Sequence, residues 1–295
     1  MTVTAITLTD PSSGYSVVIM PADGVSAQIL DVNTPARGVT EDRVNHHGSY
    51  DVSRYRGASA VSLSMILYPG VTQTPEIFMD TLGPLLDPGL RPALIVTNDQ
   101  WVTPRQLTVR YDSTTKPFSD PTNWPVQVSW QAPNAVWESS VQTTADLPII
   151  IPADTGFEFD PTIGATVTSA GYIFPATTEP SPSQVVSNGV TASDWQALIY
   201  GPCTGPRLAN DTIGSTLNFT SDMPPLNLGD YILLDSATQS AFLNSDINAP
   251  MTQYIDFLNS DWWLIQPGLN VLRFYPASAS AGSECQLTFR PAWPA

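Results

Sequence analysis

The chain is built from short stretches in which apolar and polar side chains alternate, separated by segments rich in proline, glycine, serine and aspartate. Alternation with a period of two is typical of strands that bury one face. In the first half it predicts strands at residues 3–9, 15–20, 25–32, 58–68, 93–97, 101–103, 105–111 and 124–132. The clearest is 58–68, where Val61, Leu63 and Met65 would share one face.

One segment of the first half favours a helix, at residues 75–86. Thr74 can cap its start, Pro75 suits the first turn, and Glu76 lies at the positive end of the helix dipole. At helical spacing, the apolar stripe expected to pack on a sheet comprises Ile77, Phe78, Leu82 and either Leu85 or Leu86.

The second half predicts further short strands, at 165–174, 195–200, 206–210, 215–219, 231–235 and 241–243. The most distinctive stretch is 262–274, where aromatic and branched residues flank Pro267-Gly268. Proline presets φ and glycine accepts a positive φ, as the two central positions of a type II turn require. We therefore expect residues 262–274 to form a strand–turn–strand hairpin, followed by a final strand at 286–293.

Length and composition indicate the fold class. A chain of 295 residues is long enough for two domains, and 28 prolines with 18 glycines favour short strands over long helices. The stretch 143–164 is rich in proline, aspartate and threonine, so we place an N-terminal domain at residues 1–145 and a C-terminal domain at 146–295. We predict a mainly β protein of two tandem domains: a sandwich or barrel with one helix, then a second β-sandwich.

The formal net charge is −16, and residues 146–295 hold 14 of the 27 acidic side chains but only three of the 11 basic ones. An acidic surface repels phosphate, so recognition of nucleic acid sequence is not expected. The ordinary consequence of such a charge is solubility. No apolar run approaches the roughly 20 residues of a membrane helix, and residues 1–6 lack the features of a signal peptide. We therefore expect synthesis in the cytoplasm and no membrane insertion.

The sequence shows no pattern for catalysis or metal binding. Cys203 and Cys285 lack metal-ligand spacing; they could form one disulfide, but two buried thiols are the expectation for a cytoplasmic product. His46 and His47 are adjacent, so on an extended backbone they would point to opposite faces. No serine lies in a nucleophile elbow. We predict that the protein is not an enzyme and has no catalytic residue, metal or cofactor.

Several motifs occur in the order found in one protein family. Residues 132–137 (Ala-Pro-Asn-Ala-Val-Trp) close the first half, and 199–202 (Ile-Tyr-Gly-Pro) followed by Asn210 belong to the second. A Trp-x-x-x-x-Pro-Gly-x-Asn stretch ends at Asn270, and an Arg-Pro-x-Trp stretch ends at Trp293. Over nearly the whole chain this order resembles the siphophage distal tail (Dit-like) proteins, of the phage minor tail protein family.

The resemblance implies a structural protein of the virion, at the distal end of a long non-contractile tail. The N-terminal domain would build a ring of subunits, often a hexamer, that joins the tail tube to the tip or baseplate. The galectin-like C-terminal domain would face the host. The implied partners are other copies of the chain, the tail tube protein and the tail tip or hub protein. We expect edge strands and the helix at 75–86 to supply part of the ring interface.

Three alternatives remain open. The first is a carbohydrate-binding module at the tail tip, in which Trp195, Trp262 and Trp263 contact host surface glycans. The competing interpretation is that these indoles fill the core, with one of the adjacent pair facing in and the other out. The second alternative is a glycosidase, because the sequence does not show which carboxylates lie at the separation that such an enzyme needs. The third is another tail component, such as the tube protein.

Overall fold

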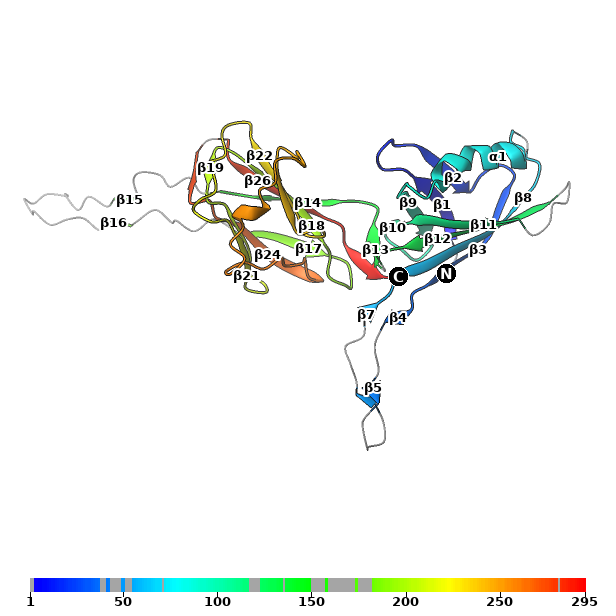
Figure 1. The fold of residues 1–295 in the computed structure, drawn as a ribbon, viewed down its shortest axis with the longest axis horizontal. Helices are drawn as coiled ribbons and strands as arrows, with labels where there is room; N and C mark the ends of the chain where they lie inside the picture. Colours follow the sequence, from blue (N-terminus) through cyan, green and yellow to red (C-terminus); the bar gives the residue numbers. More distant parts are fainter. Residues whose placement is uncertain are drawn as a thin grey trace, which may run out of the picture. The chain divides into compact units, whose positions relative to one another are not determined.

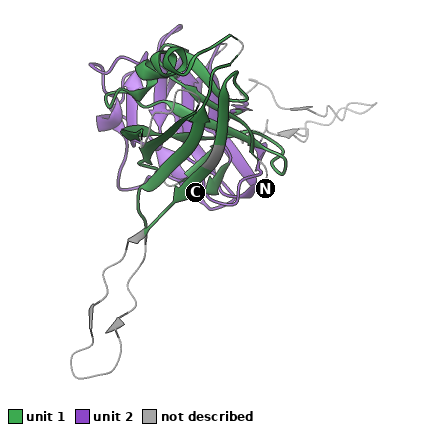
Figure 2. Cartoon of the chain, turned by 90° about the vertical axis from the view of Figure 1, so that its right-hand side faces the viewer, with its two compact units in different colours: residues 1–141, 292–295 green, residues 142–291 purple. Residues whose placement is uncertain are grey.

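The computed structural model describes residues 3–37, 41–42, 49–50, 55–70, 72–116, 123–134, 136–149, 157–158, 173–174, 182–280 and 282–295 (Figure 1). The chain divides into two compact units (Figure 2). The first comprises Met1–Val141 and Ala292–Ala295, and the second comprises Gln142–Pro291. Within the described ranges, no helix has the length and apolar character needed to cross a membrane. The adjacent histidines His46 and His47, and residues 165–172 of one predicted strand, lie outside the described residues.

The first unit is built from two antiparallel sheets. The six-stranded sheet has the order β2-β1-β9-β10-β13-β27, and the four-stranded sheet has the order β11-β12-β8-β3. Their strands are β1 Val3–Thr9, β2 Ser16–Met20, β3 Val25–Asn33, β8 Ser59–Leu67, β9 Ala93–Asn98, β10 Arg105–Thr108, β11 Arg110–Thr115, β12 Trp124–Ala132, β13 Val136–Ser139 and β27 Ala292–Pro294. Two short pairs lie between β3 and β8 in the chain: β4 (Ala36–Arg37) with β7 (Tyr55–Arg56), and β5 (Glu41–Asp42) with β6 (Ser49–Tyr50).

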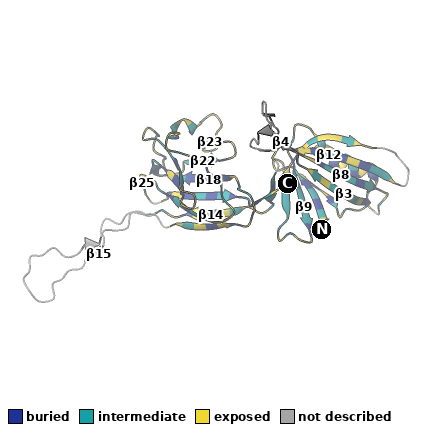
Figure 3. Ribbon diagram, turned by 90° about the horizontal axis from the view of Figure 1, so that it is seen from below, coloured by how far each residue is buried: buried dark blue, intermediate teal, exposed yellow. Residues whose placement is uncertain are grey.

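The alternation predicted for residues 58–68 is confirmed in β8. Its buried positions lie opposite buried positions of β12, in the pairs Val61 with Trp130, Leu63 with Val128 and Met65 with Val126. The six-stranded sheet contributes Leu8 and Leu94 to the same core. Buried and more exposed positions alternate along the strands in Figure 3, so the apolar face of each sheet packs against the other.

The strand predicted at residues 105–111 is two strands in different sheets. β10 pairs with β9 and β13, whereas β11 pairs with β12. Val109 lies between them, fully buried, and donates its N–H to the Pro92 carbonyl at 2.9 Å. Residues 101–103 are not a strand, because the Asn98 side chain accepts the N–H groups of the next turn, including that of Trp101 at 2.8 Å. The alternating pattern did not reveal that the chain passes from one sheet to the other at Val109, because buried and more exposed positions alternate both before and after this residue.

The predicted helix is confirmed as α1 (Pro75–Leu82), continued by the 3-10 segment η1 (Gly83–Leu86). The Thr74 hydroxyl caps it by accepting the Ile77 N–H at 3.5 Å. Its buried side chains, at helical spacing, are Pro75, Phe78, Leu82 and Leu85. Ile77, expected in this stripe, is instead 53% exposed, because it lies about 100° around the helix from Phe78.

The second unit is a sandwich of a five-stranded sheet, β14-β26-β18-β22-β23, and a four-stranded sheet, β17-β24-β20-β21. Their strands are β14 Thr143–Leu147, β17 Ser183–Ser187, β18 Trp195–Tyr200, β20 Arg207–Asn210, β21 Ser215–Asn218, β22 Tyr231–Asp235, β23 Ser240–Leu243, β24 Gly268–Phe274 and β26 Glu284–Phe289. The short elements are β15 Phe157–Glu158, β16 Ile173–Phe174, β19 Cys203–Thr204, β25 Ser278–Ala279 and η2 Thr252–Tyr254. The mainly β fold class is thus confirmed, with α1 the only α-helix among the described residues.

The predicted hairpin at 262–274 is wrong in its first half. Residues 262–267 are not a strand, and Ile265 forms only a single bridge, with Ser193. β24 begins at Gly268 and pairs with β17 and β20 instead. The positive φ expected of the glycine is present, at +86°. The chain therefore bends at Pro267-Gly268, but it passes from an irregular segment into a strand whose partners lie elsewhere in the chain.

The observed division of the chain differs from the expected one in two respects. The expected boundary after residue 145 falls inside β14, which pairs with β26 and belongs to the second unit. The last residues, expected in the C-terminal domain, form β27 and pair with β13 in the first unit. The reason is that β13 and β14 are consecutive in the chain, as are β26 and β27. The segment from β13 to β14 and the segment from β26 to β27 therefore pair twice, with β13 and β27 in the first unit and β14 and β26 in the second.

Candidate functional site

The three tryptophans predicted to contact carbohydrate form one cluster in the second unit. The Trp195 indole lies 4.6 Å from that of Trp263 and 6.1 Å from that of Trp262, between centroids, with interplanar angles of 29° and 30°. Trp195 and Trp263 are buried and Trp262 is half-buried. The adjacent pair does not divide into one indole facing in and one facing out, because both rings stack on Trp195 and Trp262 packs against the core. Contact of these residues with carbohydrate stays a prediction, and within the cluster only Trp262 keeps appreciable solvent exposure.

Hydrogen bonds hold Trp195 at the start of β18. Its main-chain N–H donates to the Ser236 hydroxyl at 2.7 Å, and its carbonyl accepts the Ser236 N–H at 3.0 Å. A buried indole usually finds a partner for its N–H, and here Nε1 donates to the Trp263 carbonyl at 2.7 Å. That carbonyl is available because the residues before β24 are not paired as a strand. The Trp263 carbonyl thus bonds to an indole instead of to the neighbouring strand that the predicted hairpin required.

A buried asparagine supports the turn that precedes β24. Asn270 has no exposed surface, and its Oδ1 accepts the Gln266 N–H at 2.9 Å. Its Nδ2 donates to the carbonyls of Gln266 and Gly268 at 2.8 and 3.2 Å. Asn210, also fully buried, donates to Asn270 Oδ1 at 3.4 Å. Both asparagines belong to the sequence motifs. They lie 60 residues apart, so no pattern of neighbouring residues predicts that they contact each other.

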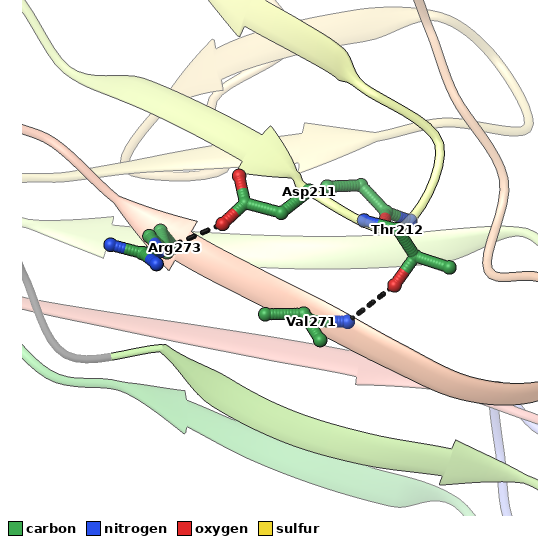
Figure 4. A network of polar contacts seen from close by, with 5 residues as sticks. Asp211, Thr212, Val271 and Arg273 are labelled. Carbon is green, nitrogen blue, oxygen red and sulfur yellow. Dashed lines mark hydrogen bonds and ion pairs between the residues drawn. The ribbon is translucent and has the colours of Figure 1, made fainter.

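The loop after β20 is fastened to β24 (Figure 4). Asp211 N–H donates to the Val271 carbonyl at 2.8 Å, and the Thr212 hydroxyl accepts the Val271 N–H at 2.8 Å. Asp211 Oδ2 lies 2.7 Å from Arg273 Nε. An ion pair this accessible to solvent contributes about 0–1 kcal/mol, so the two hydrogen bonds to the Val271 main chain are the principal link between the loop and β24.

The described residues show neither a grouped metal site nor a reactive thiol. Among them, no three His, Cys, Asp or Glu side chains are arranged to hold a metal ion. Cys203 and Cys285 are free and buried, which confirms the expectation of two thiols. Burial raises the pKa of Cys203 to about 11 and that of Cys285 well above its ordinary value. Because the thiolate is the nucleophile, we expect neither thiol to react readily near neutral pH.

In the first unit, exposed apolar side chains lie on β2 and α1. Val18 on β2 is 48% exposed, close to the value for Ile77 on α1. The exposed Tyr15 links the two elements, because its hydroxyl donates to the Thr81 carbonyl at 2.8 Å. β2 is also an edge strand of the six-stranded sheet. An open edge beside exposed apolar groups is typical of an assembly surface.

Comparison with known proteins points to one group of structures. No protein-family profile and no curated protein matches the chain. The Dit protein of SPP1, described as a paradigm of the hub adsorption apparatus in phages that infect Gram-positive bacteria, aligns with a TM-score of 0.54. The alignment covers 97% of this chain and 98% of that protein, at 11% identity.

Two structures of the phage P2 baseplate in its activated conformation align as well. The one with Ca gives a TM-score of 0.54 at 11% identity over 98% of both chains. The one with Sr gives 0.51 at 12% identity over 96% of this chain and 97% of that chain. At such identities the likeness shows the fold, and it extends over both units. The chain has the fold of the phage distal tail and baseplate hub proteins, as its motifs predicted.

Proposed function

We propose that the chain is a structural protein of the virion, at the distal end of a long non-contractile phage tail. There it would join the tail tube to the tip or baseplate. The supporting observation is that a single alignment with the SPP1 Dit protein spans nearly all of both chains. In this role the chain needs no catalytic activity and no cofactor. Its partners would be the tail tube protein and the tail tip or hub protein.

We infer that copies of the chain close into a ring of subunits, which we propose is a hexamer. A ring is built from a heterologous interface, in which one surface meets a different surface on the next copy. β2 and α1 supply one of these surfaces in the proposal, because Val18 and Ile77 are apolar side chains that are exposed and do not belong to the core. This interface would bury both side chains.

Native mass spectrometry and negative-stain imaging of the full-length chain test the ring. The expected result is a closed ring that Ile77→Asp converts to monomers, since the variant places a charge in the apolar interface. Val102→Asp is the matched control, because Val102 is fully exposed in a loop of the same unit. Monomers at every concentration, together with absence of the chain from purified tails, would contradict the proposal.

A second candidate function is contact of the second unit with host surface carbohydrate. It was predicted from the tryptophans, but a different feature of this unit favours it more strongly. The outer face of the five-stranded sheet carries tyrosines, amides and carboxylates side by side. This arrangement supplies both aromatic surface and hydrogen-bonding groups, which the buried part of the tryptophan cluster does not.

A further inference from the structure

We propose that the outer face of the five-stranded sheet in the second unit binds uncharged oligosaccharides. The proposal deepens the second candidate function. It requires neither the ring of subunits nor the predicted contacts of Trp195, Trp262 and Trp263.

Aromatic and apolar side chains form two neighbouring rows on this face. Tyr200 on β18 lies opposite Tyr231 on β22, with centroids 5.6 Å apart and an angle of 45° between the rings. Two residues along, Leu198 lies opposite Leu233, which in turn lies opposite Phe242 on β23. The rows therefore extend over three adjacent strands.

These side chains belong to the solvent side of the sheet. Their neighbours along the strands, Ile199, Ile232 and Leu234, are fully buried in the sandwich core. The two rows are only half-buried, and the alternation along β18 and β22 can be followed in Figure 3. The solvated face of an antiparallel sheet is normally polar. An apolar and aromatic surface in this place is typical of a binding site.

Amide–carboxylate pairs flank the apolar rows. Gln286 Nε2 donates to Asp146 Oδ1 at 3.1 Å, and Gln196 Nε2 donates to Asp235 Oδ2 at 3.1 Å. The oxygens of both glutamine amides accept no hydrogen bond from the described residues, and the Tyr200 hydroxyl likewise makes none with them. A sugar hydroxyl donates one hydrogen bond and accepts two. The face thus holds oriented groups for hydroxyls beside rings that suit the C–H surface of a sugar.

The charged side chains on this face indicate which class of ligand it would bind. Carboxylates in these rows and beside them are Asp146, Asp235 and Glu284, the last lying opposite Tyr200, and Asp194 lies close enough to Asp235 for their charges to repel. These carboxylates would repel phosphate groups, sulfate groups and acidic sugars. Asp146 and Asp235 already have uncharged amide donors and need no cationic partner. An uncharged oligosaccharide fits better than an anionic polymer or a basic protein surface.

A glycan array with the full-length chain, carrying uncharged and acidic glycans, tests the proposal. The uncharged glycan retained best is then titrated calorimetrically against Tyr200→Ala, Tyr231→Ala and the parent protein. We expect each tyrosine variant to lower the affinity at least tenfold. Leu269→Ala is the matched control, at a half-exposed position on β24 in the other sheet, and should leave the affinity unchanged. Thermal melting establishes that every variant is folded.

Several outcomes would overturn the assignment. These are retention of acidic glycans only, no retention at millimolar concentration, and an affinity that neither tyrosine variant changes. Polylysine serves as a probe for a basic protein partner. Binding of polylysine that the tyrosine variants abolish, without glycan binding, would assign the face to such a partner instead. The mass of the assembly, measured on the same samples, reports separately on the ring.

Discussion

The indole of Trp293 lies 3.9 Å from the guanidinium carbon of Arg105, measured to the ring centroid. The same carbon lies 4.3 Å from the indole of Trp101, so Arg105 contacts two tryptophans. Trp137, opposite Trp293 in the β13–β27 pair, contacts Trp101 with centroids 5.6 Å apart. Residues from two other parts of the chain, 101–105 and β13, thus hold the C-terminal strand in the first unit.

We predict that Trp293→Ala loosens the edge of the six-stranded sheet. A cation–π contact contributes about 0.5–2 kcal/mol, more where the cation is desolvated, and burial lowers the pKa of Arg105. Hydrogen exchange of the main-chain amides in β10 and β13 should therefore accelerate. Trp293→Phe keeps an aromatic ring and should retain most of the protection. Equal exchange in both variants would show that the ring does not hold the strand.

Replacing Asn270 should destabilise the second unit. Asn270→Ala leaves the Gln266 N–H and carbonyl without their buried partner, and each unsatisfied group costs about 1–3 kcal/mol. Asn270→Asp is the sharper variant, since it keeps an acceptor for the N–H but cannot donate to the carbonyls. We expect both to lower the urea midpoint followed by tryptophan fluorescence. Gln184→Ala, exposed on the neighbouring β17, is the control, and losses no larger than its own would refute the role of Asn270.

The two cysteines should be unreactive in the folded protein. With a pKa of about 11, Cys203 is about one part in a thousand thiolate at about pH 8, whereas an ordinary cysteine is about a quarter ionised. Cys285 should be slower still. We expect a thiol reagent such as Ellman's to react with both only after unfolding. Rapid reaction of either one in the native protein would contradict the burial of these thiols.

The turn between β1 and β2 should weaken in acid. Asp10 accepts hydrogen bonds from the Ser13 hydroxyl at 2.6 Å and from the Ser12 N–H and hydroxyl at 3.0 and 2.8 Å. These bonds lower the pKa of Asp10 from 3.8 to about 2. The ionised carboxylate therefore stabilises the fold above about pH 4, and this contribution is lost as the pH falls through about 2.

Asp10→Asn provides the measurement for this turn. The difference in free energy of unfolding between the parent protein and Asp10→Asn should shrink as the pH is lowered from about 5 to about 2, where the parent carboxyl becomes protonated. Urea unfolding across this range gives the difference directly. A difference that stays constant would mean that Asp10 does not titrate with the lowered pKa.

Much of the fold is encoded in short-range patterns. The alternation in β8 and β12, the β1–β2 hairpin and the capped helix α1 were all predicted, because each signal lies within a few neighbouring residues. The order of individually loose motifs was also sufficient to predict the Dit-like fold. For the candidate sites, aromatic content drew attention to Trp195, Trp262 and Trp263. It could not show that these indoles pack on one another rather than face solvent.

The sequence by itself determined which side chains can face a core, and with them the mainly β class and the single helix of the described chain. Only the tertiary structure decided which strands are neighbours. It divided 105–111 at Val109, left 262–267 outside any strand, and placed Trp293 in the first unit. The physical reason is that alternation reports burial of a face, whereas pairing depends on main-chain hydrogen bonds at the strand edge. The main-chain N–H and C=O groups are the same in every residue except proline, so no pattern of side chains identifies the strand with which they pair.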